Sequence, residues 1–332
     1  MHINWGIIGC GDVTEVKSGP AFKKVPGSSL MAVMRRNEEK VKDYAARHQV
    51  PKWYTNGEKL IDDPDVNAVY IATPPAYHEF YVIRALRAGK PVYVEKPMTM
   101  DARAAVRMMK AVQKANGKLS VAHYRRAQPL FKKVKELVQS EAVGKIRLVN
   151  LQLLQPHRSA MITQTDDNWR INPSISGGGL FHDLAPHQLD LMLYFFGRPL
   201  YAKGLSLNQA AHYAAADCTS GHIVFKNNIV FTGIWNFNVP ASEKRDFCEI
   251  IGTEGKISFP VFEHQQVTLT AGDTTEVLPF EKLEHVQQPM IEQVVRYFAG
   301  HAENPCPVED GVTVMSMIDA FTKRQAKVMS LV

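Results

Sequence analysis

The chain has 332 residues, of which 45% are hydrophobic and 22% charged, a composition typical of a folded globular protein. Lys and Arg number 39 against 33 Asp and Glu, with no dense basic tract, so the charge argues against nucleic-acid binding. No apolar run approaches the roughly 18 residues of a membrane span, and the four cysteines lack the CxxC spacing of zinc knuckles. We therefore expect a cytoplasmic protein with free thiols and, from its length, two domains.

The first part of the chain alternates short β-rich runs with longer helical patterns. Helical periodicity is expected over residues 38–48, 78–89 and 101–116, with Gly89 and Gly117 where a helix C-cap belongs. Strands are expected at 3–9, 29–34, 67–73, 91–96 and 119–124. This alternation predicts a doubly wound parallel sheet with helices on both faces, a Rossmann-type domain over residues 1–123.

After residue 144 the strands follow one another with little helix between them. The expected strands are 145–156, 200–207, 217–225, 229–238, 246–251, 256–262, 266–271 and 275–280, followed by helices over 290–300 and 311–329. Short turns such as the one in FKNNIVF indicate a mostly antiparallel sheet. The region 124–332 is therefore predicted to be an α+β domain that binds substrate and mediates oligomerisation.

A glycine turn follows the first expected strand. In GCGDVT, Gly9 allows the tight turn and Gly11 lets the backbone approach a pyrophosphate at the next helix N-terminus, where Asp12 and Val13 follow. Thr14 occupies the place of the third glycine of the dinucleotide fingerprint. The alternating α/β context makes this turn a predicted dinucleotide-binding site.

The end of the second expected strand bears on the choice of dinucleotide. NAD-binding proteins place an acid there, whereas this chain has Arg35 and Arg36. A guanidinium suits the 2′-phosphate of NADP, so NADP(H) is favoured over NAD(H). Two solvated arginines at a strand end are the alternative.

Four segments of the sequence stand out, namely ATPPAYH (72–78), VEKPM (94–98), NWRINPSISGGG (168–179) and GGGLFHDLAPH (177–187). By these segments and their order along the chain, the sequence resembles the glucose-fructose oxidoreductase, inositol dehydrogenase and MocA (Gfo/Idh/MocA) family. The resemblance implies an N-terminal Rossmann domain, a C-terminal open sheet often used for oligomerisation, here a homodimer or homotetramer, and NAD(P)-linked chemistry on sugars, cyclitols or related alcohols.

The resemblance also implies site residues. Lys96, Asp183 and His187 match the catalytic positions, Lys96 lying beside the nicotinamide. Further cofactor residues are Thr73, Pro74, His78 and Glu95, and substrate residues are Tyr124, Trp169 and Arg170.

The spacing of Asp183 and His187 agrees with such a role. Residues four apart on a helix share one face, and a histidine near neutral pH is a suitable proton donor to an alkoxide. Lys96 is an equally plausible donor, and the choice between them stays open. A divalent-metal site is the competing interpretation, but His182 points about 100° away from Asp183 on a helix, so no metal is expected.

These features predict an NADP-preferring oxidoreductase of a sugar, keto-sugar or cyclitol, working in the direction of carbonyl reduction. The alternatives are an NAD-linked polyol or inositol-type dehydrogenase and a dinucleotide-binding module without turnover.

Overall fold

A computed structural model describes residues 1–159, 161, 169–263 and 266–323. The chain divides into two compact units, each built from separate segments. The first contains Met1–Lys133, Ser174–Gly177 and Phe280–Met315, and the second contains Val134–Pro173, Gly178–Pro279 and Ser316–Val332. The domain division expected at residues 123 and 124 stays a prediction.

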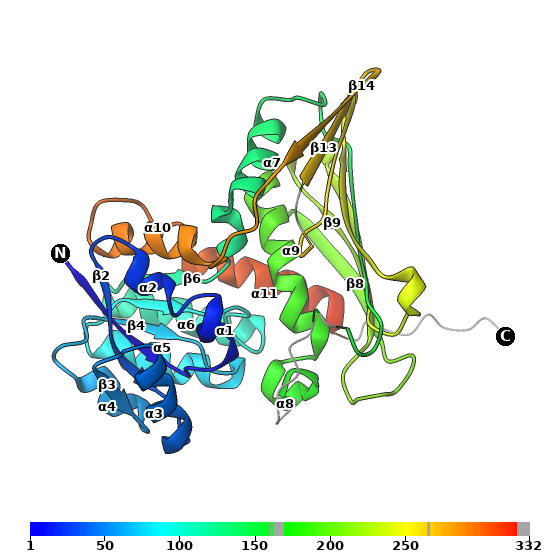
Figure 1. The fold of residues 1–332 in the computed structure, drawn as a ribbon. Coiled ribbons are helices and arrows are strands. Elements are labelled where there is room, and N and C mark those ends of the chain that lie inside the picture. The colour runs from blue at the N-terminus through cyan, green and yellow to red at the C-terminus, as the bar shows by residue number, and fades with distance from the viewer. Residues whose placement is uncertain (160, 162–168, 264–265, 324–332) are drawn as a thin grey trace. The chain divides into compact units, whose positions relative to one another are not determined.

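The first unit contains a six-stranded parallel sheet in the order β3-β2-β1-β4-β5-β6, as expected of a dinucleotide-binding fold (Figure 1). Its central strands are buried on both faces, which explains their nearly continuous runs of apolar residues. The strands are β1 (Ile3–Ile8), β2 (Ser28–Met34), β3 (Lys52–Tyr54), β4 (Ala68–Ile71), β5 (Val92–Val94) and β6 (Leu119–Val121).

The helices of this unit begin at side-chain caps in several places. Asn37 accepts a hydrogen bond from the Lys40 N–H at the start of α3, and Asp101 accepts one from Ala104 at the start of α6. The expected C-cap at Gly117 was wrong by one residue, because Asn116 adopts the left-handed conformation, with φ 46°. The helices are α1 (Asp12–Val16), α2 (Ala21–Lys24), α3 (Glu38–Arg47), α4 (Gly57–Asp62), α5 (His78–Arg87), α6 (Ala102–Ala115) and α10 (Gln288–Phe298), with 3-10 turns η1 (Pro75–Tyr77) and η2 (Tyr124–Ala127).

The second unit contains an eight-stranded sheet in the order β14-β13-β12-β11-β7-β10-β9-β8. Only β7 and β10 pair in parallel, so the mostly antiparallel sheet expected from the sequence is confirmed. The strands are β7 (Leu148–Leu154), β8 (Tyr201–Leu207), β9 (Cys218–Val224), β10 (Val230–Asn236), β11 (Arg245–Ile251), β12 (Gly255–Phe259), β13 (Gln266–Ala271) and β14 (Thr274–Pro279).

Helix α9 (Leu180–Phe196) packs on one face of this sheet. The rings of Phe181 and Trp235 lie 5.1 Å apart, and Trp235 donates its indole N–H to the Gln188 side chain at 2.6 Å. Pro186 lies inside α9, which begins at Leu180 and continues through the proline to Phe196. Nearby are α8 (Pro173–Ser176) and the 3-10 turn η3 (Trp169–Ile171).

Helices α7 (Pro129–Gln139) and α11 (Val308–Thr322) contribute residues to both units. In the second unit the last turn of α11 places Phe321 against β8 and β9. A Cβ built on Gly221 would lie 2.4 Å from the Phe321 ring, and one built on Gly204 would lie 2.9 Å from it. Glycine in these strands therefore makes room for a buried aromatic ring.

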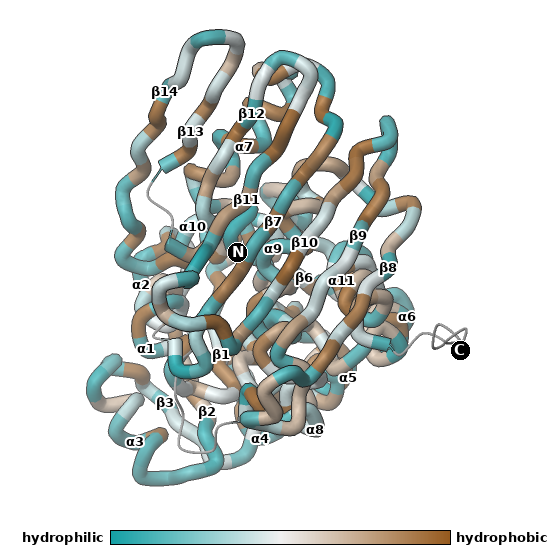
Figure 2. The backbone as a smooth tube through the Cα atoms, turned by 90° about the vertical axis from the view of Figure 1, so that its right-hand side faces the viewer, coloured by the Kyte–Doolittle hydropathy of each residue, from teal (hydrophilic) through white to brown (hydrophobic). Residues whose placement is uncertain are grey.

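The other face of the eight-stranded sheet carries apolar side chains in register. Tyr201, Val224, Val230 and Leu148 occupy paired positions on four neighbouring strands. Figure 2 shows this face toward the viewer, with hydrophobic segments along β7 to β10. Tyr201 is 53% exposed and Leu205, on the same strand, 54%. Such a face is typical of a protein contact surface.

Among the described residues, no helix has both the length and the apolar character needed to cross a bilayer. The segment NWRINPSISGGG (168–179) and the expected closing helix 311–329 fall partly outside those residues.

Candidate functional site

The glycine turn joins β1 to α1 in a conformation that a side chain would disturb. Gly9 has φ +93°, and a Cβ there would lie 2.8 Å from the backbone nitrogen of Thr73. A Cβ on Gly11 would meet only the Gly9 oxygen at 4.0 Å, so the space beside its backbone is open. Asp12 and Val13 form the first turn of α1.

Thr14 fulfils a capping role at the place of the third fingerprint glycine. Its hydroxyl donates to the Gly11 carbonyl at 2.8 Å and accepts from the Gly11 N–H at 3.0 Å. The side chain is completely buried. Threonine in place of glycine therefore stabilises the turn through its own hydrogen bonds. The backbone N–H groups of Asp12 and Val13 stay at the start of the helix, where an α-helix offers no acceptor for them.

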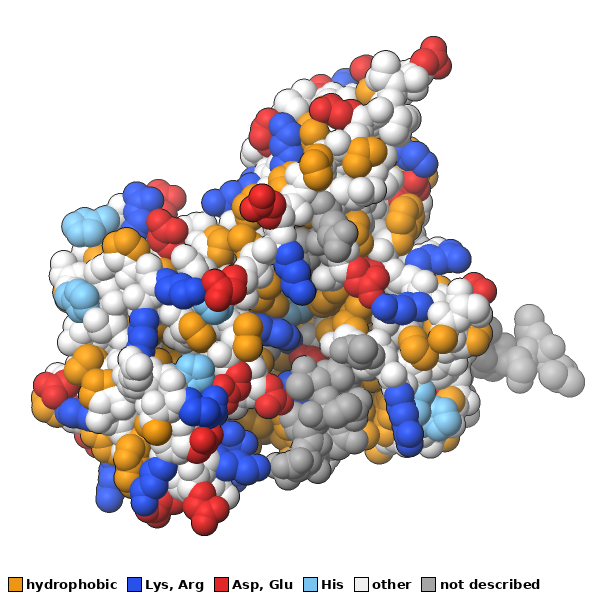
Figure 3. Space-filling model, viewed as in Figure 1, with side chains coloured by type: hydrophobic (Ala, Val, Ile, Leu, Met, Phe, Trp, Pro, Cys, Tyr) orange, Lys and Arg blue, Asp and Glu red, His pale blue; other side chains and the backbone are white. Residues whose placement is uncertain are grey.

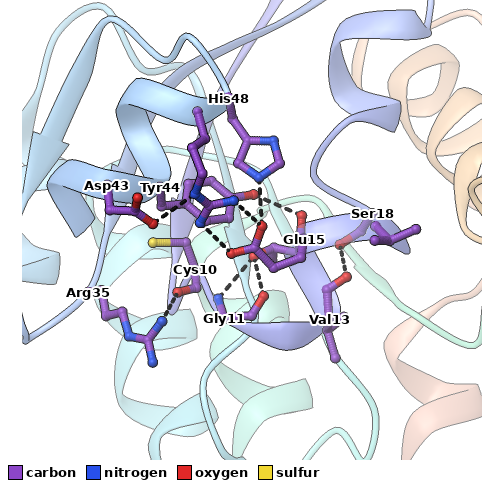
Figure 4. A network of polar contacts seen from close by, with 12 residues as sticks. Cys10, Gly11, Val13, Glu15, Ser18, Arg35, Asp43, Tyr44 and His48 are labelled. Carbon is purple, nitrogen blue, oxygen red and sulfur yellow. Dashed lines mark hydrogen bonds and ion pairs between the residues drawn. The ribbon is translucent and has the colours of Figure 1, made fainter. Parts of the chain in front are cut away.

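A network of ion pairs fixes α1 against α3 (Figure 4). The Arg47 guanidinium donates two hydrogen bonds to the Glu15 carboxylate, each of 2.9 Å, and His48 lies 2.8 Å from it. These contacts, with that of Arg47 first, lower the pKa of Glu15 to about 2. Tyr44 donates to the Thr14 carbonyl at 2.8 Å. The helix that follows the glycine turn is thus held at both its start and its middle.

The two arginines after β2 lie on the same side of this unit as the turn. Arg35 is half-buried, and its guanidinium is 3.4 Å from the Cys10 carbonyl oxygen in the turn, as Figure 4 shows. Arg36 is exposed and lies over the ring of Tyr77, 5.6 Å from its centre. Glu38, the first acid after this point, belongs to the first turn of α3.

The loops after β4 and β5 are joined by a buried histidine. His78 lies 2.7 Å from the Thr73 carbonyl oxygen through Nε2 and 3.1 Å from that of Pro97 through Nδ1. Burial lowers its pKa to about 4, so the ring is neutral at physiological pH. A neutral ring carries one N–H, so one of the two nitrogens donates to a backbone oxygen while the buried side chain packs between the two loops. Pro74 precedes η1 in the first of them.

Lys96 follows β5 at the carboxyl edge of the sheet, where ligands bind in folds of this type. It is half-buried, whereas its neighbour Glu95 is 5% exposed and bonded to Tyr70 and Gln287. Because Val94 pairs with Val121, the strand register brings the residue two positions beyond β6, His123, next to Lys96. Burial, and then the positive charge of Arg126, lower the pKa of His123 to about 3.

The turn η2 continues this edge. Tyr124 and Arg125 are both buried, with the guanidinium 5.6 Å from the ring centre. Arg126 forms an ion pair of 2.8 Å with Asp310. The structure thus gathers the expected residues of the first unit along one edge of one sheet.

In the second unit, the four-residue spacing places Asp183 and His187 one turn apart on α9. Arg170, from η3, forms an ion pair of 3.3 Å with Asp183, and the Trp169 ring lies 4.6 Å from the guanidinium. His187 is 4% exposed and packs edge-on against Phe262. Two expected substrate residues and one expected catalytic residue therefore form one group, in which Arg170 is buried and Trp169 and Asp183 are half-buried.

His182 belongs to a different environment. Its ring fills the space beside Gly178, where a Cβ would lie 2.2 Å from Nδ1. Burial lowers its pKa to about 4, against the smaller opposing effect of the negative charge of Asp319. In the described parts of the chain, no three His, Cys, Asp or Glu side chains cluster as a metal ion would require.

The first unit has features that fit a dinucleotide. The Thr73 hydroxyl is buried and has no hydrogen-bond partner among the described residues, beside a turn whose Gly11 leaves the backbone accessible. An orphaned hydroxyl at the carboxyl edge of a Rossmann sheet suits a ligand polar group. Gly9, Gly11, Asp12 and Val13 would hold the pyrophosphate, and Thr73 and Lys96 follow β4 and β5 at the same edge of the sheet.

Fold and site together define a Rossmann-fold oxidoreductase that uses a nicotinamide dinucleotide. Residues 3–123 match the family model described as "Oxidoreductase family, NAD-binding Rossmann fold", and residues 131–258 match the "GFO/IDH/MocA C-terminal domain". The chain belongs to the Gfo/Idh/MocA family, and the expected resemblance is confirmed. It is 49% identical over 322 residues to oxidoreductase P35 of Formosa agariphila, covering 96% of this chain and 98% of that protein.

Solved structures share the fold across the chain. Levoglucosan dehydrogenase in complex with NADH and levoglucosan superposes with a TM-score of 0.85 at 22% identity, covering 96% of both chains. The 3-ketoreductase KijD10 of Actinomadura kijaniata, in complex with NADP and TDP-benzene, has a TM-score of 0.81 at 20% identity, covering 96% of this chain and 97% of that one. These likenesses show the fold, and they include proteins bound to either dinucleotide.

Proposed function

We propose that the protein is an NADP-preferring reductase of a carbonyl group in a sugar, keto-sugar or cyclitol. The observation that carries the proposal is the convergence of the glycine turn, the orphaned Thr73 hydroxyl and Lys96 at one edge of one sheet. Arg35 and Arg36, which follow β2, support NADP because a guanidinium suits the 2′-phosphate, and their contacts within the described residues are with the Cys10 carbonyl and the Tyr77 ring.

The proposed chemistry uses two side chains, Lys96 and His187. The dinucleotide, when bound, would supply the hydride for the carbonyl carbon. The oxygen of that carbonyl becomes an alkoxide, which the Lys96 ammonium stabilises by its charge. Lys96 or His187 then donates the proton that completes the alcohol.

Asp183 and its neighbours contribute to substrate binding in this proposal. The ion pair with Arg170 orients the Asp183 carboxylate, and Trp169 restrains the guanidinium. A fixed carboxylate accepts a hydroxyl hydrogen bond from a polyol, while the indole offers an apolar face to a sugar ring. Tyr124, in the turn η2 after β6, is the third proposed substrate residue.

The assembly and location belong to the same proposal. The apolar row from Tyr201 to Leu148 supports a homodimer or homotetramer formed through the eight-stranded sheet. Lys and Arg are interspersed with Asp and Glu on the face drawn in Figure 3, which supports a small-molecule substrate over a nucleic acid. Free thiols at all four cysteines agree with a cytoplasmic location.

The decisive experiment screens keto-sugars, aldoses and cyclitols with NADPH and NADH, following the absorbance of the reduced nicotinamide. With the best substrate, Lys96→Met and His187→Ala should each lower kcat by about two to four orders of magnitude. Lys110→Met, on the exposed side of α6, is the matched control and should keep wild-type turnover.

The outcomes separate the rival functions. Turnover of polyols with NAD⁺ and none of ketones with NADPH would favour the NAD-linked dehydrogenase. Tight dinucleotide binding with no turnover across the panel, and the same result for Lys96→Met, would favour a binding module without catalysis.

A further inference from the structure

A buried carboxylate immediately precedes Lys96. Glu95 Oε1 accepts hydrogen bonds from the Tyr70 hydroxyl at 2.6 Å and from the Gln287 amide at 2.7 Å. Its Oε2 accepts from the backbone N–H of Lys96 at 3.1 Å. Charged groups are buried only where hydrogen bonds compensate for lost water, so these donors fix the carboxylate, and the carboxylate fixes the peptide N–H of Lys96.

Both side-chain donors are themselves fixed. Tyr70 is completely buried, and burial, followed by the negative charge of Glu95, raises the pKa of its phenol well above the usual value, so it stays a donor. Gln287 is completely buried as well, and its Oε1 accepts a hydrogen bond from Tyr93 at 3.3 Å. The amide therefore has a defined orientation, with its N–H toward Glu95.

Residues 285–287 connect the Glu95 carboxylate with α1, the helix after the glycine turn. The backbone N–H of Gln287 donates to the Lys17 carbonyl at 3.1 Å, and His285 Nδ1 lies 2.7 Å from the Val16 carbonyl oxygen. Gln128 donates to the Val286 carbonyl at 3.0 Å. One short segment thus holds the end of α1, the turn after β6 and the carboxylate before Lys96, all within the first unit.

We propose that Gln287 and Tyr70 are positioning residues for Lys96, acting through Glu95. The inference rests on the proposed function of Lys96, and it assigns Glu95 to orienting the lysine rather than to contacting the dinucleotide. A displacement of about 1 Å of a reacting group can cost on the order of a hundredfold in rate. Removing one donor leaves a buried carboxylate incompletely bonded, and the Lys96 backbone shifts with it.

The first test measures Lys96 itself, without cofactor or substrate. Acetic anhydride labels the protein, and mass spectrometry follows the acetylation rate of each lysine. Gln287→Leu should change the rate at Lys96 by about threefold or more, as expected of an altered backbone position, and leave exposed Lys110 unchanged. Gln293→Leu is the control, because the Gln293 amide donates to the Pro289 carbonyl within its own helix, α10.

The second test separates positioning from general destabilisation. Gln287→Leu should lower kcat by about tenfold or more, with the KM for dinucleotide within about twofold. In a Lys96→Met background the same substitution should cause no further loss, since it acts through the lysine. Tyr70→Phe, which removes one oxygen, should reproduce both results and serves if Gln287→Leu fails to fold.

The inference would be overturned if both variants kept the wild-type acetylation rate at Lys96 and the wild-type kcat. It would also be overturned if Gln287→Leu lowered kcat by the same factor in the Lys96→Met background as in the wild type. Failure of the proposed function has a different signature, because Lys96→Met would then keep its turnover while the acetylation result still reports on positioning.

Discussion

At the scale of single residues, Arg35 and Arg36 carry the expected choice of dinucleotide. We predict that NADP(H) binds at least about tenfold more tightly than NAD(H), or about 1.4 kcal/mol. Arg35→Ala with Arg36→Ala should remove most of this preference, weakening NADP binding far more than NAD binding because NAD lacks the 2′-phosphate. Titration of both dinucleotides by calorimetry measures it. Arg87→Ala, in the last turn of α5, serves as the control, and equal affinities in the wild type would contradict the prediction.

The ion pairs of Glu15 should make the free energy of unfolding depend on pH. The folded-state pKa of Glu15 is about 2, below the ordinary value of 4.5, so its ion pairs stabilise the fold fully above about pH 4.5 and lose this effect as the pH falls toward 2. Because Arg47 is half exposed, Glu15→Gln should cost only about 1 kcal/mol at pH 7. Urea unfolding at pH 7, 5 and 3.5 should show the difference from wild type shrinking with acidity. A difference that grows toward low pH would contradict this account.

Some site residues could be predicted from the sequence, and others could not. The shared helix face of Asp183 and His187 follows from their four-residue spacing, and the tight turn follows from the backbone conformations that glycine allows. Gln287 and Tyr70 carry no such local signal, since their roles depend on Glu95, which is distant in the chain. Arg170 was expected to contact substrate, and only the fold revealed its ion pair with Asp183.

At the scale of elements, the packing of α11 on β8 and β9 predicts a large mutational effect. Phe321 is completely buried against Gly204 and Gly221, so Phe321→Ala should destabilise the second unit by about 3–5 kcal/mol. Gly221→Ala should also destabilise it, since the new Cβ would overlap the ring. Thermal unfolding measures both, with Phe80→Ala as the control because Phe80 is 55% exposed. Near-wild-type stability of Phe321→Ala would argue against this packing.

Most elements were predictable because each has a clear periodicity. The strands from 200 to 280 were placed within three residues of their observed ends, since apolar residues alternate between turn signals. The short strand β3 and helix α4 were not predicted. Lys52–Tyr54 spans only three residues, too few for an alternating pattern, and α4 is six residues long.

At the scale of the whole molecule, the open face of the eight-stranded sheet predicts an oligomer. Wild-type protein should sediment as a multiple of 37.2 kDa, and Leu205→Lys with Val230→Lys should dissociate it, because charges at the centre of an apolar contact lose their hydration. Phe80→Lys, in the first unit, should leave the assembly intact. A monomeric wild type would contradict the proposed interface.

The return of residues 280–315 to the first unit has a consequence for how the protein is made. Glu95 and its partner Gln287 are separated by 192 positions, which a ribosome adding about 5–20 residues per second takes roughly 10–40 s to translate. During that interval the nascent Rossmann sheet holds a carboxylate that lacks its amide donor. The site around Lys96 can therefore be completed only after nearly the entire chain has been synthesised. A stalled or truncated product retains the glycine turn without an ordered lysine.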